Sequence, residues 1–365
     1  MQNKTAMGPR HVRVLVVDDS EVARLLLVHI LEADPQISVV GVVGDGPAAL
    51  EFVRNRTPDA VLMDIHMPGM DGFEATRRIM ERHPVPIVIC SAAANPAEVA
   101  TTFRAMEAGA LAFVEKPPGP EHAGYERLAA HLRQTVKLMS EVKVVRRWGR
   151  ERLAHLGTPR TPVGRTRTPA ELRVVGIGAS TGGPQVLQEI LAGLPKTFPL
   201  PILVVQHIAH GFLPGLAEWL NQTTSFRIQI AAYGVSPLPG HVYLAPDDFH
   251  MGLGVSGRIL LTREAPQNHL RPAVAFLFRT LAEVCGAAAV GVLLTGMGCD
   301  GALELKMMKD AGAMTIAQDR DSSVVYGMPG EAVRLGGAAQ VLAADKIADA
   351  LVAIVNRLVS TGGTP

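Results

Sequence analysis

Short apolar runs and longer amphipathic segments alternate along the first part of this chain. The apolar runs are residues 14–17, 39–43, 61–63, 87–90 and 111–114. The segments between and after them repeat apolar residues every three or four positions, as helices do, and cover residues 22–31, 47–54, 72–82, 97–108 and 125–139. Because strands that alternate with helices form parallel sheets, this pattern predicts a doubly wound α/β domain.

A second series of apolar runs begins near residue 171. Residues 174–178, 202–206, 290–295 and 314–318 are each followed by a helical pattern, which predicts a second doubly wound, Rossmann-like domain with a parallel sheet. Pro-Gly turns separate three further β-like segments, at 226–231, 241–245 and 259–262. We expect these three segments to form antiparallel hairpins inserted into the second domain.

The segment between the two series differs from both in composition. Residues 137–167 carry nine Lys or Arg against two Glu and end in a stretch rich in Pro, Gly and Thr. This composition favours a solvated helix end that leads into a flexible linker, although the basic bias would also suit an acidic partner. We therefore expect a first domain at 12–140, a linker at 141–170 and a second domain at 171–360.

Composition narrows the possible functions. The 365 residues have a net charge of +1 and 4% aromatic residues, which argues against a nucleic-acid-binding surface. The first ten residues are polar and the longest apolar run, 287–294, is too short for a bilayer, so we expect no membrane insertion and a cytoplasmic, monomeric protein. Cys90, Cys285 and Cys299 have no metal-ligand spacing and are expected to be buried thiols.

Acidic residues follow two strands of the predicted first domain. Asp18 and Asp19 follow the first strand and Asp64 the third, while Ser91 and Lys116 follow the fourth and fifth. The carboxyl ends of parallel strands face one crevice, so these side chains should converge there. Taken singly, each could be a turn residue or a helix cap. Together they favour a Mg²⁺ site at which Asp64 acts as a nucleophile toward a phosphoryl group.

This part of the chain resembles the response-regulator receiver family over about residues 12–140. The motifs are Asp-Asp-Ser at 18–20, Leu-Met-Asp-Ile-His-Met-Pro-Gly-Met-Asp-Gly at 62–72, Cys-Ser-Ala at 90–92 and Glu-Lys-Pro at 115–117. The resemblance implies a flavodoxin-like fold, phosphorylation of Asp64 by a histidine kinase and sensing of the phosphoryl group by Ser91, Lys116 and Phe113. It also implies Mg²⁺ ligands from Asp18, Asp19, Asp64 and the carbonyl of His66. Related receivers usually carry Glu at the position of His66, which bears on the phosphoryl lifetime.

A Gly-rich bend follows the first strand of the second domain. Residues 178–184 read Gly-Ala-Ser-Thr-Gly-Gly-Pro, which predicts a strand, a tight bend carrying Ser180 and a helix that begins at Pro184. Small neighbours and unblocked N–H groups suit a nucleophilic serine. Ser180 could instead be a plain turn residue. A dinucleotide-binding loop is disfavoured, because Thr181 takes its third glycine position and the next strand ends without an acidic residue.

Two other strand ends supply possible partners for Ser180. The next strand leads into His207, which could accept the serine proton, although it could also be a turn histidine and His210 could compete with it. A later strand leads to Asp300, which could orient the imidazole or instead cap the helix that follows it. Glycines on both sides of Met297 would let its N–H approach a developing oxyanion.

The second domain resembles the catalytic domain of the chemotaxis protein-glutamate methylesterases over about residues 172–358. The motifs lie at 178–183, 206–207 and 295–301, with smaller pieces at 239–246, 271–272 and 326–329. The resemblance implies that Ser180 is the nucleophile, His207 the general base and Asp300 its orienter, with Met297 and Thr181 as oxyanion donors. The family usually continues Ser-Val-Asp after Arg271-Pro272, where this chain has Ala273-Val274-Ala275, so the family's substrate contacts do not carry over there.

A receiver followed by this esterase is the architecture of that family. It implies a phosphorylation-activated serine hydrolase that removes methyl esters from glutamate on a methyl-accepting chemoreceptor, and that also deamidates glutamine. The esterase reaction would need no cofactor. The alternative is a non-enzymatic phospho-switch that binds a partner through a degenerate esterase domain. A DNA-binding regulator is not expected, since the chain lacks a basic carboxyl-terminal domain.

Overall fold

The computed structural model describes residues 11–91, 103, 105, 106, 108–142, 144 and 173–359. One compact unit contains the described residues up to 144 with the short segments 180–185 and 207–223, and a second unit contains the remainder. The expected boundaries at 12–140 and 171–360 stay a prediction, because most of the expected linker lies outside the described residues. None of the helices described in these ranges is both long and apolar enough to cross a membrane.

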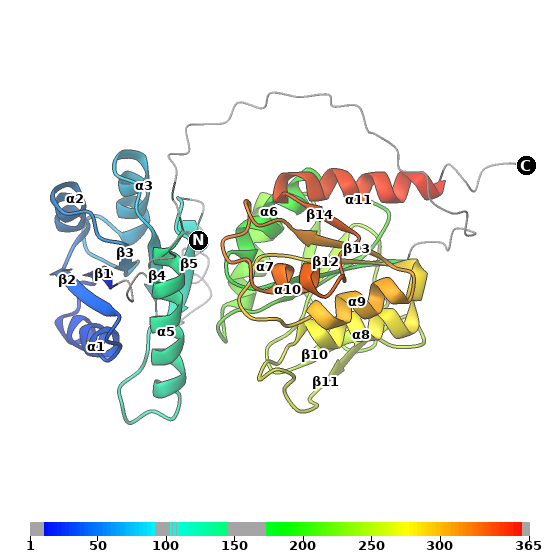
Figure 1. The fold of residues 1–365 in the computed structure, drawn as a ribbon, viewed down its shortest axis with the longest axis horizontal. Coiled ribbons are helices and arrows are strands. Elements are labelled where there is room, and N and C mark those ends of the chain that lie inside the picture. The colour runs from blue at the N-terminus through cyan, green and yellow to red at the C-terminus, as the bar shows by residue number, and fades with distance from the viewer. Residues whose placement is uncertain are drawn as a thin grey trace, which may run out of the picture. The chain divides into compact units, whose positions relative to one another are not determined.

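A parallel five-stranded sheet in the order β2-β1-β3-β4-β5 forms the centre of the first unit (Figure 1). Its strands are β1 (Val12–Val17), β2 (Ile37–Val43), β3 (Ala60–Met63), β4 (Ile87–Ser91) and β5 (Ala112–Glu115). Helices α2 (Gly46–Asn55) and α3 (Gly72–Arg82) cover one face, and α1 (Glu21–Glu32) and α5 (Tyr125–Ser140) cover the other. The predicted flavodoxin-like topology is confirmed. The predicted helix at 97–108 lies largely outside the described residues.

Polar side chains determine where the helices after β1, β2 and β3 begin. A side-chain oxygen accepts a backbone N–H of the first turn in each case: Ser20 from Ala23 at 3.3 Å, Asp45 from Ala48 at 2.7 Å and Asp71 from Glu74 at 2.8 Å. Each such bond satisfies a donor that the helix itself leaves free. These caps keep the loops after β1 and β3, which carry the acidic residues, short and closely attached to the sheet.

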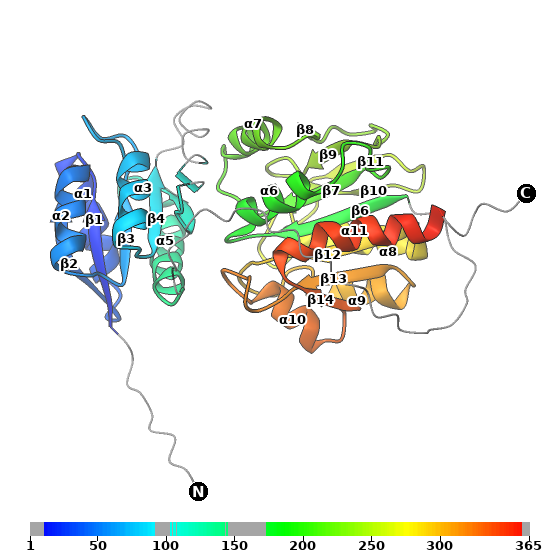
Figure 2. The same ribbon diagram turned by 90° about the horizontal axis from the view of Figure 1, so that it is seen from above.

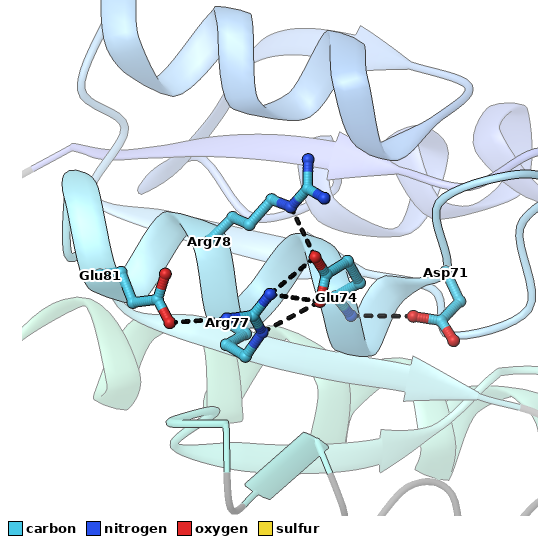
Figure 3. A network of polar contacts seen from close by, with 5 residues as sticks. All are labelled: Asp71, Glu74, Arg77, Arg78 and Glu81. Carbon is cyan, nitrogen blue, oxygen red and sulfur yellow. Dashed lines mark hydrogen bonds and ion pairs between the residues drawn. The ribbon is translucent and has the colours of Figure 1, made fainter.

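Helix α3 carries a network of charged side chains on its outer surface (Figure 3). Glu74 accepts hydrogen bonds from Arg77 Nη2 at 2.8 Å and from Arg78 Nε at 2.6 Å, and Arg77 also binds Glu81 at 2.9 Å. These residues are three or four positions apart and therefore lie on neighbouring turns. Because the network faces solvent, water screens it, and it orders α3 locally more than it stabilises the unit.

A second parallel sheet has the order β14-β13-β12-β6-β7-β9-β8 (Figure 2). Its strands are β6 (Val174–Ala179), β7 (Ile202–Gln206), β8 (Arg227–Ile230), β9 (His241–Leu244), β12 (Ala289–Leu293), β13 (Met314–Gln318) and β14 (Gln340–Leu342). The helices along this part of the chain are α6 (Gly183–Gly193), α7 (Leu213–Thr223), α8 (Val274–Val284), α9 (Ala302–Asp310), α10 (Met328–Arg334) and α11 (Ala344–Val359). The predicted Rossmann-like class is confirmed.

The predicted hairpins are only partly correct. β8 and β9 pair in parallel with each other, and β9 pairs in parallel with β7, so both strands belong to the main sheet. Among the described strands, β10 (His250–Leu253) and β11 (Ile259–Thr262) form the antiparallel pair. Alternation of apolar and polar residues indicates a strand with one covered face but not its direction. The direction of β9 depends on the loop from β8, which returns the chain to the same end of the sheet.

Glycines in β6 allow α8 to approach the sheet closely. A Cβ at Gly176 would overlap Leu281 of α8, and one at Gly178 would overlap Val274 at the start of the same helix. Val274 and Leu281 are fully buried in the core between sheet and helix. Side chains of α8 therefore pack directly on the backbone of β6, because β6 has no side chain at these two positions.

Gly72 provides a test of such close packing in the first unit. A Cβ at Gly72 would overlap the backbone carbonyl of Asp64, which has little freedom to move. Gly72→Ala should lower the free energy of unfolding by about 2 kcal/mol or more, measured by thermal or urea denaturation. Gly119→Ala is the matched control, since nothing lies within 4 Å of its Cβ position. Equal effects of the two substitutions would contradict the steric explanation.

Candidate functional site

The carboxylates of Asp18, Asp19 and Asp64 gather where β1 and β3 end. One oxygen of each lies within 4.8 Å of the others. β1 and β3 pair in parallel with Val17 opposite Met63, so the residues after them leave the sheet at the same level. Asp18 and Asp64 are buried, whereas Asp19 is exposed. The structure thus brings together the three acidic residues that the sequence singled out.

Lys116 joins this cluster from the end of β5. Its Nζ lies 2.7 Å from Asp18 Oδ2 and 3.2 Å from Asp64 Oδ2. Backbone N–H groups hold the other oxygens, with Ile65 donating to Asp64 at 2.9 Å and Ser20 donating to Asp18 at 3.0 Å. One ammonium group faces two buried carboxylates, so the cluster keeps an excess of negative charge when all three groups are ionised.

Burial and charge shift the pKa values of this cluster. Burial raises the pKa of Asp64, and the charge of Asp18 adds to the effect, while Lys116 opposes it. For Lys116, burial acts to lower the pKa, but the hydrogen bond to Asp18 and the charges of both carboxylates outweigh it, so its pKa is raised. When Asp18 and Asp64 are both ionised, their carboxylates therefore repel each other. A hard divalent cation prefers carboxylate oxygens, and the donor set fits Mg²⁺.

The other predicted receiver residues lie around this cluster or on neighbouring strands. Ser91 ends β4, and its Oγ is buried with no hydrogen-bond partner among the residues described here. A buried hydroxyl of this kind can donate to an incoming oxygen. Phe113 of β5 is half-buried and packs edge to face on Phe103, with ring centroids 5.6 Å apart. The His66 side chain is exposed, and the ligand role of its carbonyl stays a prediction.

The seven-stranded sheet places three strand ends of the second site beside one another. β6 pairs with β7 so that Ala179 lies opposite Gln206, and Ser180 and His207 follow directly from these two residues. On its other side β6 pairs with β12, which leads into the loop of Asp300. Parallel strands present their carboxyl ends at one edge. The strand of the predicted nucleophile is therefore flanked by the strands of its two predicted partners.

Glycine makes the bend at Ser180 possible. The N–H of Gly183 donates to the carbonyl of Ser180 at 2.8 Å, and Gly182 has a φ of 78°, a conformation that residues with side chains rarely adopt. Helix α6 begins at Gly183, one residue before the predicted start. Ser180 itself is half-buried.

Backbone amides at the start of α8 hold the Asp300 carboxylate. Val274 N–H donates to Oδ2 at 2.6 Å, Ala275 N–H donates to Oδ1 at 3.1 Å and the Asn268 side-chain amide donates to Oδ1 at 3.3 Å. The alternative that Asp300 caps the helix after it is wrong, because Gly301 occupies the cap of α9 without a side-chain bond. A helix N-terminus favours negative charge. Asp300 is consequently both oriented and stabilised as a carboxylate.

The loop between β13 and α10 fixes the segment that carries Met297. Val325 N–H donates to Thr295 Oγ1 at 2.9 Å, and Gly296 N–H donates to the Val325 carbonyl at 3.0 Å. A Cβ at Gly327 would lie 2.7 Å from the Gly296 carbonyl oxygen. The N–H groups of Gly327 and Met328 donate to the same carbonyl at 3.1 and 2.9 Å, so the peptide that carries the Met297 N–H is held in place. Such preorganisation is what an oxyanion donor needs.

Some features of this site were not predicted from the sequence. Asn268 contacts a carboxylate 32 positions further along the chain, and no sequence pattern indicates such a contact. A positive φ of 51° at Asn268 fits the tolerance of Asn for this conformation. The expectation of buried thiols holds for Cys90, holds only in part for Cys285, which is half-buried, and is wrong for Cys299, which is exposed next to Asp300 in the chain.

Both parts of the chain match known protein families. Residues 14–123 match the response regulator receiver domain, and residues 175–351 match the CheB methylesterase family. These matches agree with the fold and the two sites. Together they define the class as a response regulator whose receiver is joined to an esterase domain.

Similar proteins extend this assignment to nearly the whole chain. A protein-glutamate methylesterase/protein-glutamine glutaminase of Geobacter metallireducens is 53% identical over 344 residues, covering 94% of this chain and 99% of the relative. One from Nitrosospira multiformis is 50% identical over 344 residues, covering 94% and 97%. The Thermotoga maritima CheB methylesterase catalytic domain is 41% identical, with a TM-score of 0.49, and covers 51% of this chain and all of that structure. The chain belongs to the protein-glutamate methylesterase/protein-glutamine glutaminase family.

The raised pKa of Asp64 gives a test of the acidic cluster. Because the pKa is higher in the folded than in the unfolded chain, the free energy of unfolding falls as the pH rises from the unfolded-state pKa through the folded-state pKa, and the loss is complete above the folded value. Asp64→Asn should therefore raise the melting temperature at neutral pH without divalent cations. Mg²⁺ at ten times its dissociation constant should add about 1.4 kcal/mol to the free energy of unfolding of the native chain.

Asp64→Asn is also the control for the cation, since it removes one carboxylate while Lys116 keeps Asp18 as its partner. Mg²⁺ should raise the free energy of unfolding of this variant much less than that of the native chain, with both measured by calorimetry. If the variant gains as much as the native chain, the cluster is not the cation site.

Proposed function

We propose that this protein is a phosphorylation-activated serine hydrolase that removes methyl esters from glutamate side chains of a chemoreceptor and deamidates glutamine side chains. The observation that carries the proposal is the parallel register of β12, β6 and β7, from which the Asp300, Ser180 and His207 segments leave one sheet edge. Relatives with these activities in their names are about half identical over nearly the full length of the chain.

In the proposed reaction, Ser180 Oγ attacks the ester carbonyl carbon while His207 takes the serine proton. Backbone N–H groups of Met297 and Thr181 stabilise the oxyanion that forms. The carbon–oxygen bond then breaks, and His207 returns the proton to the leaving methanol. Asp300 keeps the imidazole in the required orientation.

Water completes the cycle. His207 removes a proton from a water molecule, which attacks the acyl-enzyme and releases glutamate, and the proton returns to Ser180. For a glutamine side chain the first leaving group is ammonia instead of methanol. One site therefore serves both reactions, and neither requires a cofactor.

The receiver unit supplies the control. Asp64 accepts a phosphoryl group from a histidine kinase, and Lys116 and Ser91 contact its oxygens, with Phe113 as the aromatic residue that responds. Asp18, Asp19, Asp64 and the carbonyl of His66 would hold Mg²⁺, which when bound neutralises negative charge on the phosphoryl group. The excess negative charge of the cluster and the unpartnered Oγ of Ser91 within the described chain support this assignment.

The proposal implies a location and partners. The substrate is the cytoplasmic helical region of a methyl-accepting chemoreceptor, so the protein acts in the cytoplasm, and the phosphodonor is a histidine kinase. Its net charge of +1 supports a protein substrate and no role for nucleic acid.

Replacement of Ser180 tests the central step. Ser180→Ala should lower release of methanol and ammonia from methylated receptor fragments by about a thousandfold or more, because it removes the hydroxyl that attacks the ester carbon. Phosphorylation of Asp64 by a small phosphodonor should stay intact in this variant. Hydrolysis that survives the substitution would remove Ser180 from its role.

Two further measurements complete this test. Asp64→Asn should abolish the stimulation of hydrolysis by the small phosphodonor, which separates control from chemistry. A fluorophosphonate probe should label Ser180 covalently in the native chain. Absence of labelling, together with absence of hydrolysis, would favour the non-enzymatic switch.

Gly327 tests the oxyanion donor. A Cβ there would press on the backbone of Gly296 and Gly298, at 2.7 and 2.9 Å, and displace the Met297 peptide. Gly327→Ala should lower kcat for ester hydrolysis by about tenfold or more, with little change in KM. Gly254→Ala is the control, because its Cβ would lie at an ordinary 3.6 Å from the nearest atom, the Arg258 carbonyl oxygen. An unchanged kcat in Gly327→Ala would contradict the role of the Met297 peptide.

A further inference from the structure

His250 is a buried histidine that the proposed reaction does not use. It is 0% exposed at the start of β10, and its ring stacks on Phe276 of α8 with centroids 5.1 Å apart. Its Nδ1 lies 3.2 Å from the backbone N of Ala273, and its Nε2 lies 3.2 Å from the carbonyl oxygen of Ala265. The ring therefore connects two backbone segments.

The partners of His250 determine where its proton lies. A backbone N–H can only donate and a backbone carbonyl can only accept, so Nδ1 must accept from Ala273 and Nε2 must donate to Ala265. The neutral ring with its hydrogen on Nε2 satisfies both bonds. A protonated ring would instead place an N–H group against the N–H of Ala273. Burial, which lowers the pKa of His250, acts in the same direction.

The beginning of α8 has no capping side chain of its own. Ala273 occupies the cap position and makes no side-chain hydrogen bond to the helix. His250 binds the N–H of Ala273, and Asp300 binds the N–H groups of Val274 and Ala275. The first turn of α8 is thus held by two side chains that are distant in sequence.

Val274 connects this turn to both strand ends of the candidate active site. Its Cγ1 occupies the space that a Cβ would need at Gly178 and at Gly301. Gly178 lies two residues before Ser180, and Gly301 follows Asp300. Because packed interiors have no free space, a shift of the first turn of α8 would move both segments.

We propose that His250 is a positioning residue for the esterase reaction. By accepting the N–H of Ala273, it keeps the first turn of α8 in register, so that the amides of Val274 and Ala275 hold the Asp300 carboxylate in one orientation. The inference rests on the proposed role of Asp300 as the residue that orients His207. Any loss of the Nδ1 acceptor then changes the chemical step more than substrate binding.

Two matched substitutions separate the two hydrogen bonds of His250. In His250→Asn the side-chain oxygen can take the place of Nδ1, whereas in His250→Gln the side-chain amide can take the place of Nε2. Both remove the ring that stacks on Phe276, so both lose similar packing. The measurement is kcat and KM for methyl ester hydrolysis by the full chain, with circular dichroism as the check on folding.

His250→Gln should lower kcat by about tenfold or more relative to His250→Asn, with KM values that agree within about twofold, because a displacement of about 1 Å in the catalytic groups can cost about a hundredfold in rate. Equal kcat values in the two variants, or a lower value in His250→Asn, would overturn the inference.

Asp300→Asn distinguishes this inference from the proposed function. If Asp300→Asn lowers kcat while the two His250 variants agree, only the positioning role of His250 fails. If Asp300→Asn keeps the native kcat, the role of Asp300 in the proposed function fails, and the inference fails with it.

A spectroscopic measurement covers the case in which neither His250 variant folds. The ¹⁵N shifts of the His250 ring in the native chain, assigned through its contact with Phe276, should show a neutral ring with the proton on Nε2 at neutral pH. A proton on Nδ1 would overturn the proposal, since that nitrogen could then not accept from Ala273.

Discussion

Parallel pairing of strands is the constraint on which both sites depend. In a parallel sheet every strand ends at the same edge, so residues that are far apart along the chain leave the sheet side by side. In the first unit this brings the acidic residues after β1 and β3 together with Lys116 after β5. In the second sheet it places the Ser180 strand between the strands that lead to His207 and Asp300. Chemistry at each edge follows from the residue type at the end of each strand.

The two sites stabilise buried negative charge in different ways. Asp18 and Asp64 share one ammonium group and a few N–H donors, and they keep an excess of charge that suits a cation and a phosphoryl group. Asp300 is held by three N–H donors, two of them at the start of a helix. The first arrangement suits a site whose net charge changes when a cation or a phosphoryl group is bound. The second is suited to a carboxylate that stays ionised and in one place.

Much of the fold could be predicted, and the errors have a common cause. Hydrophobic periodicity located the strands of the first sheet, and all but β14 of the second, to within a few residues. The caps at Ser20, Asp45 and Asp71 emerged only from the structure. The direction of β8 and β9 was predicted wrongly, because apolar alternation records which face of a strand is covered and not which way it runs. The alternative that Asp300 caps the following helix was wrong because local spacing cannot show a partner helix that begins 26 positions earlier.

The sequence by itself determined the two α/β sheets, the residues at the strand ends and the family, since these depend on periodicity and on short motifs. Only the tertiary structure decided which donors hold Asp300, how the loop before α10 fixes the Met297 peptide, and that His250 binds the first turn of α8. The physical reason is that most of these contacts join a side chain to a backbone N–H that is far away in the sequence. Every residue has the same backbone N–H and C=O groups apart from proline, so no side-chain pattern reveals which of them will meet.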